Sequence, residues 1–196
     1  MRRPSRRQRR LVLLTLTLLA FGLAYYAGSR YQNQPQPAVS ITGVAIQPPT
    51  PLPTLPETED TSPIQRQSLV GRWCLLMLDP HAGQIRSPAL IRLLHIHNRL
   101  AADPELQQRI RFLYLPRELH ETEREAIDRL GENLHALGGD ADRVDETLRQ
   151  FGVEPEGDRT ALYLIGPDTR LHALFTPDQD IATIAEDLTT LITSEP

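Results

Sequence analysis

The chain has 196 residues, of which 40% are apolar and 23% are charged, a composition that suits one globular domain with additional segments. Its formal net charge is −4, but residues 1–10 hold six of the 21 basic residues and no acidic one. The rest of the chain, with 15 basic and 25 acidic residues, therefore carries −10. This acidic body argues against nucleic acid as a partner, because binding to phosphates needs clustered positive charge.

An uncharged apolar segment follows the basic start. Residues 11–28, LVLLTLTLLAFGLAYYAG, are just long enough to cross a bilayer as a helix. The arginines before it predict that residues 1–10 lie in the cytoplasm. The long apolar run and the missing A-x-A pattern favour an uncleaved anchor over a cleaved signal peptide, for which 27–29 is a weak cleavage site. We therefore expect a single-pass protein of the bacterial inner membrane with a periplasmic C-terminal domain.

A proline-rich stretch separates this segment from the rest of the chain. Residues 29–66 include PQP and QPPTPLPTLP and few large apolar residues, which is typical of an extended, semi-rigid linker. Within the linker, VSITGVAI has the composition of a short strand that docks on the domain. Residues 67–196 are left as the folded domain.

Apolar patterns in 67–196 alternate between the strand and helix periods. We expect strands at 73–78, 110–115, 160–165 and 170–175, and helices at 87–102, 121–137, 141–151 and from 177 onward. Ser87 precedes Pro88 as an N-cap, and Gly138-Gly139 is a plausible end of the second helix. The order predicts an α/β, thioredoxin-like domain, with a central mixed β-sheet flanked by helices, behind the transmembrane helix.

The sequence contains few residues that point to catalysis. Cys74 is the only cysteine, which excludes a CxxC pair, and its place in an apolar run indicates a buried small residue. Ser87 lacks a G-x-S-x-G motif, and no glycine loop has the spacing for phosphate. We therefore expect no catalytic residue, no cofactor and no small-molecule substrate.

Several short motifs follow one another along the predicted domain. Gly71-Arg72-Trp73 leads into CLLML, GQIRSP follows at 83–88, and YLIGP occupies 163–167. Together they resemble the SCO/SenC family, membrane-anchored thioredoxin-fold proteins that deliver copper to cytochrome c oxidase. In that family the loop carries Cys-Pro-x-x-Cys-Pro and a histidine precedes the YLIDP strand. The resemblance places Gly83 and Ser87 at the two cysteine ligands and Arg159 at the histidine ligand.

These three replacements remove the chemistry that the resemblance implies. Cu(I) prefers soft donors, whereas Gly83 has no side chain and Ser87 offers a hard hydroxyl. Arg159 is a permanent cation, and thiol–disulfide exchange needs a thiolate that this loop lacks. The sequence thus predicts no metal, with His81 as the one remnant near the old metal position.

The resulting hypothesis is a non-catalytic, membrane-anchored SCO-like protein. It would be an accessory in respiratory cytochrome c oxidase assembly, with oxidase subunits or assembly factors as partners. His81, Arg86 and Arg159 are the candidate partner-binding residues, because a thioredoxin fold presents its working loop there. Two alternatives are a copper chaperone with a histidine-based site at His81 and a periplasmic thiol oxidoreductase that uses Cys74.

Overall fold

The computed structural model describes residues 22, 41–56, 69–82 and 85–194. The chain divides into two units, 1–38 and 39–196, and the second unit holds the folded domain. In the described part of the chain, no helix is long and apolar enough to cross a membrane. The predicted anchor at 11–28 lies outside the described residues except for Gly22, and so does Gly83.

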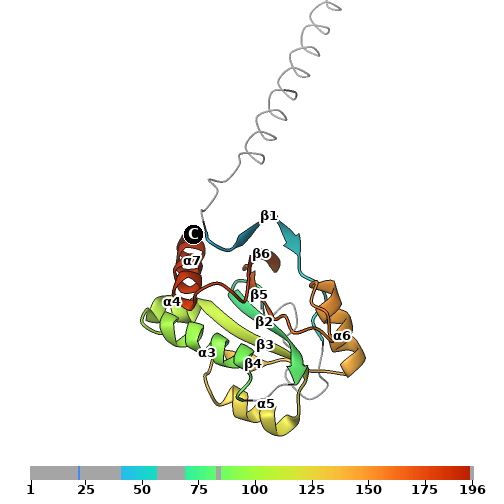
Figure 1. Cartoon of the computed structure of the whole chain (residues 1–196). Helices are drawn as coiled ribbons and strands as arrows, with labels where there is room; N and C mark the ends of the chain where they lie inside the picture. Colours follow the sequence, from blue (N-terminus) through green and yellow to red (C-terminus); the bar gives the residue numbers. More distant parts are fainter. Residues whose placement is uncertain (1–21, 23–40, 57–68, 83–84, 195–196) are drawn as a thin grey trace, which may run out of the picture. The chain divides into compact units, whose positions relative to one another are not determined.

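A six-stranded mixed sheet forms the centre of the domain (Figure 1). Its strands are β1 (Val44–Pro51), β2 (Trp73–Ala82), β3 (Ile110–Glu118), β4 (Leu134–Ala136), β5 (Ala161–Ile165) and β6 (Arg170–Phe175). Their order across the sheet is β1-β6-β5-β2-β3-β4. Strand β3 runs parallel to β2 and β4, and the other neighbouring pairs are antiparallel.

Helices cover both faces of this sheet. Helices α3 (Pro88–Leu100), α4 (Pro104–Arg109) and α7 (Ile181–Ser194) lie on one side, α6 (Ala141–Gln150) lies on the other, and α5 (Glu121–Asp128) lies beside β4. Alternate residues of a strand point to opposite faces. Leu75 and Met77 therefore enter the core under α3 and α7, and Leu76 and Leu78 enter the core under α6. The continuous apolar run of β2 follows from burial on both faces.

The predicted α/β arrangement is confirmed, but one predicted helix is wrong over its second half. Residues 121–137 were expected to be one helix, whereas α5 ends at Asp128 and Leu134–Ala136 forms β4. The Asp128 carboxylate accepts a hydrogen bond from the Ala136 amide (3.0 Å), and the Asn133 side chain donates to the Ile110 carbonyl (3.3 Å). These contacts hold the chain extended beside β3, so Gly138-Gly139 does not end a helix.

Strand β1 brings part of the predicted linker into the sheet. Val44 pairs with Leu174, so residues 44–51 form an edge strand of a domain that the sequence places at 67–196. Just before β1, the Asp187 carboxylate of α7 accepts hydrogen bonds from the amides of Thr42 and Gly43, both at 2.9 Å. Asp187 is 7% exposed, so this pair of bonds fixes the point where the chain enters the domain.

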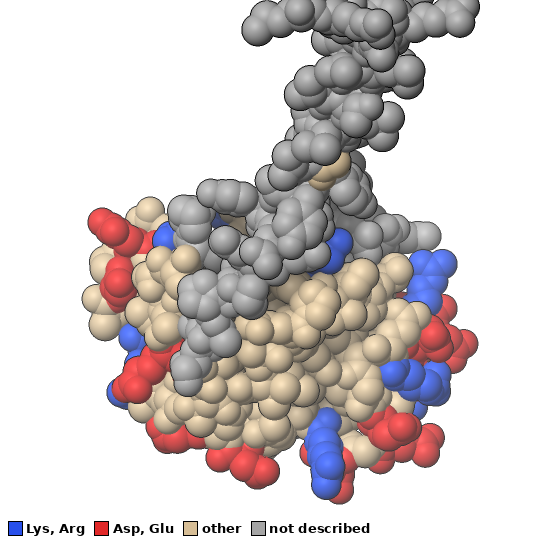
Figure 2. Space-filling view, turned by 90° about the horizontal axis from the view of Figure 1, so that it is seen from above, with Lys and Arg blue, Asp and Glu red and all other residues tan. Residues whose placement is uncertain are grey.

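The charged surface is mixed in sign. In Figure 2, acidic and basic side chains alternate around the margin of the face seen from above, and uncharged side chains fill much of its centre. A surface of this kind produces no broad field of one sign on that face.

Candidate functional site

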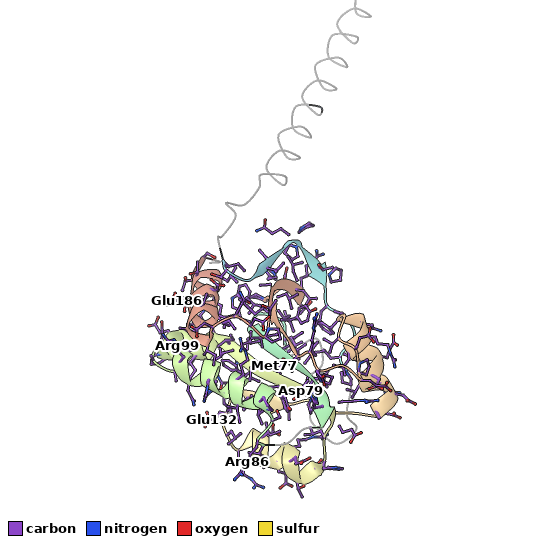
Figure 3. The ribbon with its side chains drawn as sticks, viewed as in Figure 1. Met77, Asp79, Arg86, Arg99, Glu132 and Glu186 are labelled. Carbon is purple, nitrogen blue, oxygen red and sulfur yellow. The ribbon has the colours of Figure 1, made fainter. Side chains whose placement is uncertain are left out.

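The candidate site lies where β2 ends and the chain turns toward α3. Ligands of α/β sheets commonly bind outside the carboxyl ends of parallel strands, and β2 and β3 end together here. Figure 3 shows Asp79 inside the domain, beyond Met77 toward the end of β2, and Arg86 at the margin below it. Strand β2 contributes Asp79 and His81, the N-cap of α3 contributes Ser87, and β3 contributes Tyr114.

A buried carboxylate is the centre of this group. Asp79 is 1% exposed, and its Oδ2 accepts a hydrogen bond from the Tyr114 hydroxyl at 2.7 Å. Its Oδ1 accepts one from the His81 backbone amide at 3.1 Å and lies 2.9 Å from Nδ1 of the same residue. A carboxylate removed from water is costly unless it is hydrogen-bonded, and these donors meet that requirement.

The hydrogen bonds continue from Asp79 into helix α3. Because Tyr114 gives its proton to Asp79, its oxygen accepts from the Ser87 hydroxyl, 2.9 Å away. The Ser87 oxygen in turn accepts from the Leu90 amide at 3.0 Å, which is the N-cap bond that the sequence predicted. Burial and the nearby Asp79 charge raise the pKa of Tyr114, so the phenol stays protonated as a donor.

His81 connects this buried group to the surface. Its side chain is 55% exposed, and the Asp79 carboxylate directs a ring proton to Nδ1. In the neutral ring, Nε2 is then an acceptor, and it lies 3.6 Å from Oδ1 of the fully exposed Asp158. The His81 imidazole and the Asp158 carboxylate are two potential metal ligands. The described residues contain no cluster of three or more His, Cys, Asp or Glu residues that could hold a metal ion.

The other predicted residues are separated. Arg159 is exposed in the loop between α6 and β5, next to Asp158, so it lies on the same side of the site as His81. Arg86 is exposed in the turn before α3. Among the described residues, no hydrogen bond or ion pair joins Arg86 to His81 or Arg159. Their role in binding a partner stays a prediction.

Cys74 lies apart from this group, near the start of β2, while Asp79 and His81 lie near its end. Its side chain is fully buried, and burial raises the pKa of the thiol to about 12. At neutral pH it is therefore a protonated core side chain. Exchange chemistry requires an accessible thiolate, so this location argues against Cys74 as a nucleophile.

An open cavity of about 910 Å³ adjoins the site. It lies between the loop from α6 to β5 and the loop from β6 to α7. Asp158 and Arg159 line it, and the contact from Asp158 to His81 connects the cavity to the end of β2. Cavities of this size accommodate a small ligand or several side chains of a bound segment.

Sequence reasoning missed Asp79 and Tyr114. The predicted strand 73–78 stops one residue before Asp79, and Tyr114 lies within the predicted strand 110–115 as one of its apolar-run residues. A polar side chain within a strand buried on both faces is itself a signal, because it must find a partner there. The sequence does not indicate that the partners are each other.

No family model matches the sequence, and no curated protein matches it. The structure is similar to apo Sco1 from Thermus thermophilus, with 18% identity over 81% of this chain and 99% of that chain and a TM-score of 0.55. It is similar to BsSco, a member of the Sco family of cytochrome c oxidase assembly proteins, with 17% identity over 76% and 98% and a TM-score of 0.58. Copper-bound yeast Sco1 matches with 14% identity over 67% and 84% and a TM-score of 0.54.

At these identities the likeness is one of fold, and it spans nearly the whole length of the two Sco structures named first. The chain therefore has the thioredoxin-like fold of the Sco proteins.

Proposed function

We propose that this chain is a non-catalytic, membrane-anchored Sco-like protein that acts as a binding accessory in the assembly of respiratory cytochrome c oxidase. The membrane anchor comes from residues 11–28 of the sequence, and the link to the oxidase comes from the likeness in fold to Sco proteins. The protein would face the periplasm and hold its partner through the surface around His81 and Arg159.

The observation that supports a non-catalytic role most directly is the hydrogen-bond chain at the end of β2. Ser87 stands where the family resemblance places a copper-binding cysteine. The residue is 7% exposed, and its hydroxyl is hydrogen-bonded to both Tyr114 and Leu90. A hydroxyl used in this way stabilises the helix start and the strand end. Because its donor and its acceptor are both engaged, this arrangement argues against Ser87 as a metal ligand or nucleophile.

Copper binding tests the proposal from two sides. The full chain in detergent is titrated with Cu(I) against a chelating indicator, beside the triple variant Gly83→Cys, Ser87→Cys, Arg159→His. We expect no stoichiometric binding by the wild type and one tightly bound Cu(I) per chain in the variant, because the variant restores the soft donors. Failure of the variant to bind would contradict the alignment of these three positions with the family's ligands.

A histidine-based copper site is the second candidate, because Nε2 of His81 faces the surface and the Asp79 carboxylate orients the ring from behind. A ligating histidine is commonly held by such a carboxylate. The control is His95→Ala, at an exposed position of α3. Stoichiometric Cu(I) binding by the wild type, abolished by His81→Ala and kept by His95→Ala, would favour this candidate over the non-metal proposal. Co-purification of the native membrane protein tests the oxidase link separately, since oxidase subunits or assembly factors are the expected partners.

A further inference from the structure

The cavity beside His81 has an apolar floor. The apolar residues that line it come from the segment just after α6, from β5 and from β6: Phe151, Val153, Ala161, Tyr163, Leu174 and Phe175. The Phe151 and Tyr163 rings pack with centroids 5.0 Å apart, and the Tyr163 hydroxyl donates to the Phe151 carbonyl at 2.6 Å. The tyrosine proton is therefore used inside the fold. Ala161 and Leu174 are half-buried whereas the other four are buried, so these two side chains offer carbon surface to an occupant.

Carboxylates dominate the charged residues that line the same cavity. Glu154, Asp158 and Asp178 line it together with a single guanidinium, that of Arg159. Arg92 of α3 acts electrostatically on Asp178 from the neighbouring side, and the ring of His81 faces Asp158. Glu154 and Asp158 are both exposed at the mouth. An anionic small molecule is disfavoured there, and a cation attached to an apolar group is favoured.

We propose that this cavity is a docking groove for an extended segment of a partner protein, which inserts an apolar side chain against the floor and places Arg or Lys beside Glu154 and Asp158. The inference rests on the proposed function as a binding accessory, and it specifies the chemistry of the partner at that site. Apolar anchors held in a pocket and surrounded by polar contacts are the usual source of affinity in such interfaces.

Two synthetic hexapeptides test the charge and the apolar anchor together. The probe is fluorescein-labelled Gly-Arg-Leu-Trp-Arg-Gly, and its counterpart carries Glu in place of both Arg residues. Anisotropy is measured with the full chain in detergent. We expect saturable binding of the basic peptide and at least about tenfold weaker binding of the acidic one, with the difference decreasing as salt screens the rim.

Variants of the chain locate the binding. Glu154→Gln with Asp158→Asn should weaken the basic peptide by about tenfold, since two charge contacts are removed. Glu105→Gln with Glu186→Gln removes the same charge from exposed positions on α4 and α7 and should leave binding unchanged. Thr160 is half-buried and lines the cavity. Thr160→Trp should fill the space that the apolar side chain of the peptide occupies and so abolish binding. Far-UV circular dichroism checks that this variant is folded.

Three results would overturn the proposal: no saturable binding up to about 1 mM, equal binding of the two peptides, or equal weakening by the two double variants. Co-purification separates this inference from the proposed function. Recovery of oxidase subunits by both the wild type and the Glu154→Gln, Asp158→Asn variant would leave the function standing and reject the groove. Peptide binding at the groove without any respiratory-chain component in the co-purified material would support the groove and reject the proposed function.

Discussion

At the scale of single residues, the end of β2 is built around one buried charge. Asp79 accepts hydrogen bonds from Tyr114 and His81, and the Tyr114 oxygen in turn accepts one from the Ser87 hydroxyl. Removal of one member leaves a buried donor or acceptor without its partner, which costs more than the bond itself contributes. The group should therefore respond to substitution as a unit.

Tyr114→Phe should lower the free energy of unfolding by about 1–3 kcal/mol, because Asp79 Oδ2 and the Ser87 hydroxyl both lose their partner. Urea unfolding of the full chain, followed by fluorescence of the single, buried Trp73, measures this. Tyr163→Phe is the matched control, since its hydroxyl serves one carbonyl only and should cost less. Additivity with Asp79→Asn to within about 0.5 kcal/mol would contradict the coupled group.

Cys74 should be inert to alkylation in the folded protein. Its side chain is fully buried and the pKa of its thiol is raised to about 12, so the thiolate fraction stays small well above neutral pH. Iodoacetamide labelling under native conditions should stay slow between about pH 7 and pH 10, whereas an exposed thiol accelerates near its ordinary pKa of about 8.5. Rapid labelling that follows an ordinary thiol titration would support the oxidoreductase alternative.

At the scale of elements, helix α7 and the segment before β1 depend on each other. The Asp187 carboxylate accepts from the amides of Thr42 and Gly43, and a Cβ on Gly43 would lie 2.7 Å from Phe175. Gly43 is thus required by close approach to the core. Among the described residues, this carboxylate is the side chain that accepts from both amides, so β1 should loosen when it is removed.

Asp187→Ala should speed hydrogen exchange in β1 by at least about tenfold relative to β2, because two amides lose a charged acceptor. Glu186→Ala, at the exposed neighbouring position, is the control and should leave exchange in β1 unchanged. Exchange is measured by mass spectrometry on peptides that cover 41–56 and 73–82. Equal protection of β1 in the two variants would show that strand pairing with β6 alone holds the segment.

The success of the sequence predictions also differs by element. Strands 73–78 and 170–175 were predictable because their apolar patterns are local, and Ser87-Pro88 marks a helix start by its own chemistry. Strand β4 was not predictable from a local pattern. Its three residues form a strand because they pair with β3 and because the side chains of Asp128 and Asn133 make hydrogen bonds that keep the chain extended. The Asp79–Tyr114 bond was equally hidden, since it joins two strands that no local pattern aligns.

At the scale of the whole molecule, a buried thiol and two buried phenols that stay protonated in the fold should make the protein less stable at alkaline pH. Burial raises the pKa of Cys74 to about 12 and also raises the pKa values of Tyr114 and Tyr163. In the unfolded chain these groups have their ordinary pKa values, about 8.5 for Cys and about 10 for Tyr. The folded state then binds more protons than the unfolded state, so stability is complete below these values and is lost as pH rises through them.

The free energy of unfolding should therefore fall above about pH 8.5, first through Cys74 and then through the two tyrosines, with a slope of up to about 1.4 kcal/mol per pH unit for each group. Urea unfolding at a series of pH values measures the slope. Cys74→Ala removes the thiol and should flatten the curve between about pH 8.5 and pH 10, apart from a uniform loss of packing. An unchanged slope in that window would show that the thiol does not titrate differently on folding.

The sheet order has a consequence for how the chain folds as it is made. Strand β1 is synthesised first, yet its partner is β6, and the central strand β2 pairs with β5 from the last third of the domain. These closures join residues far apart in sequence, which makes them slow. The first strand to leave the ribosome is thus left with its pairing edge uncovered until almost the whole chain has followed, and aggregation during that interval is the hazard this topology carries.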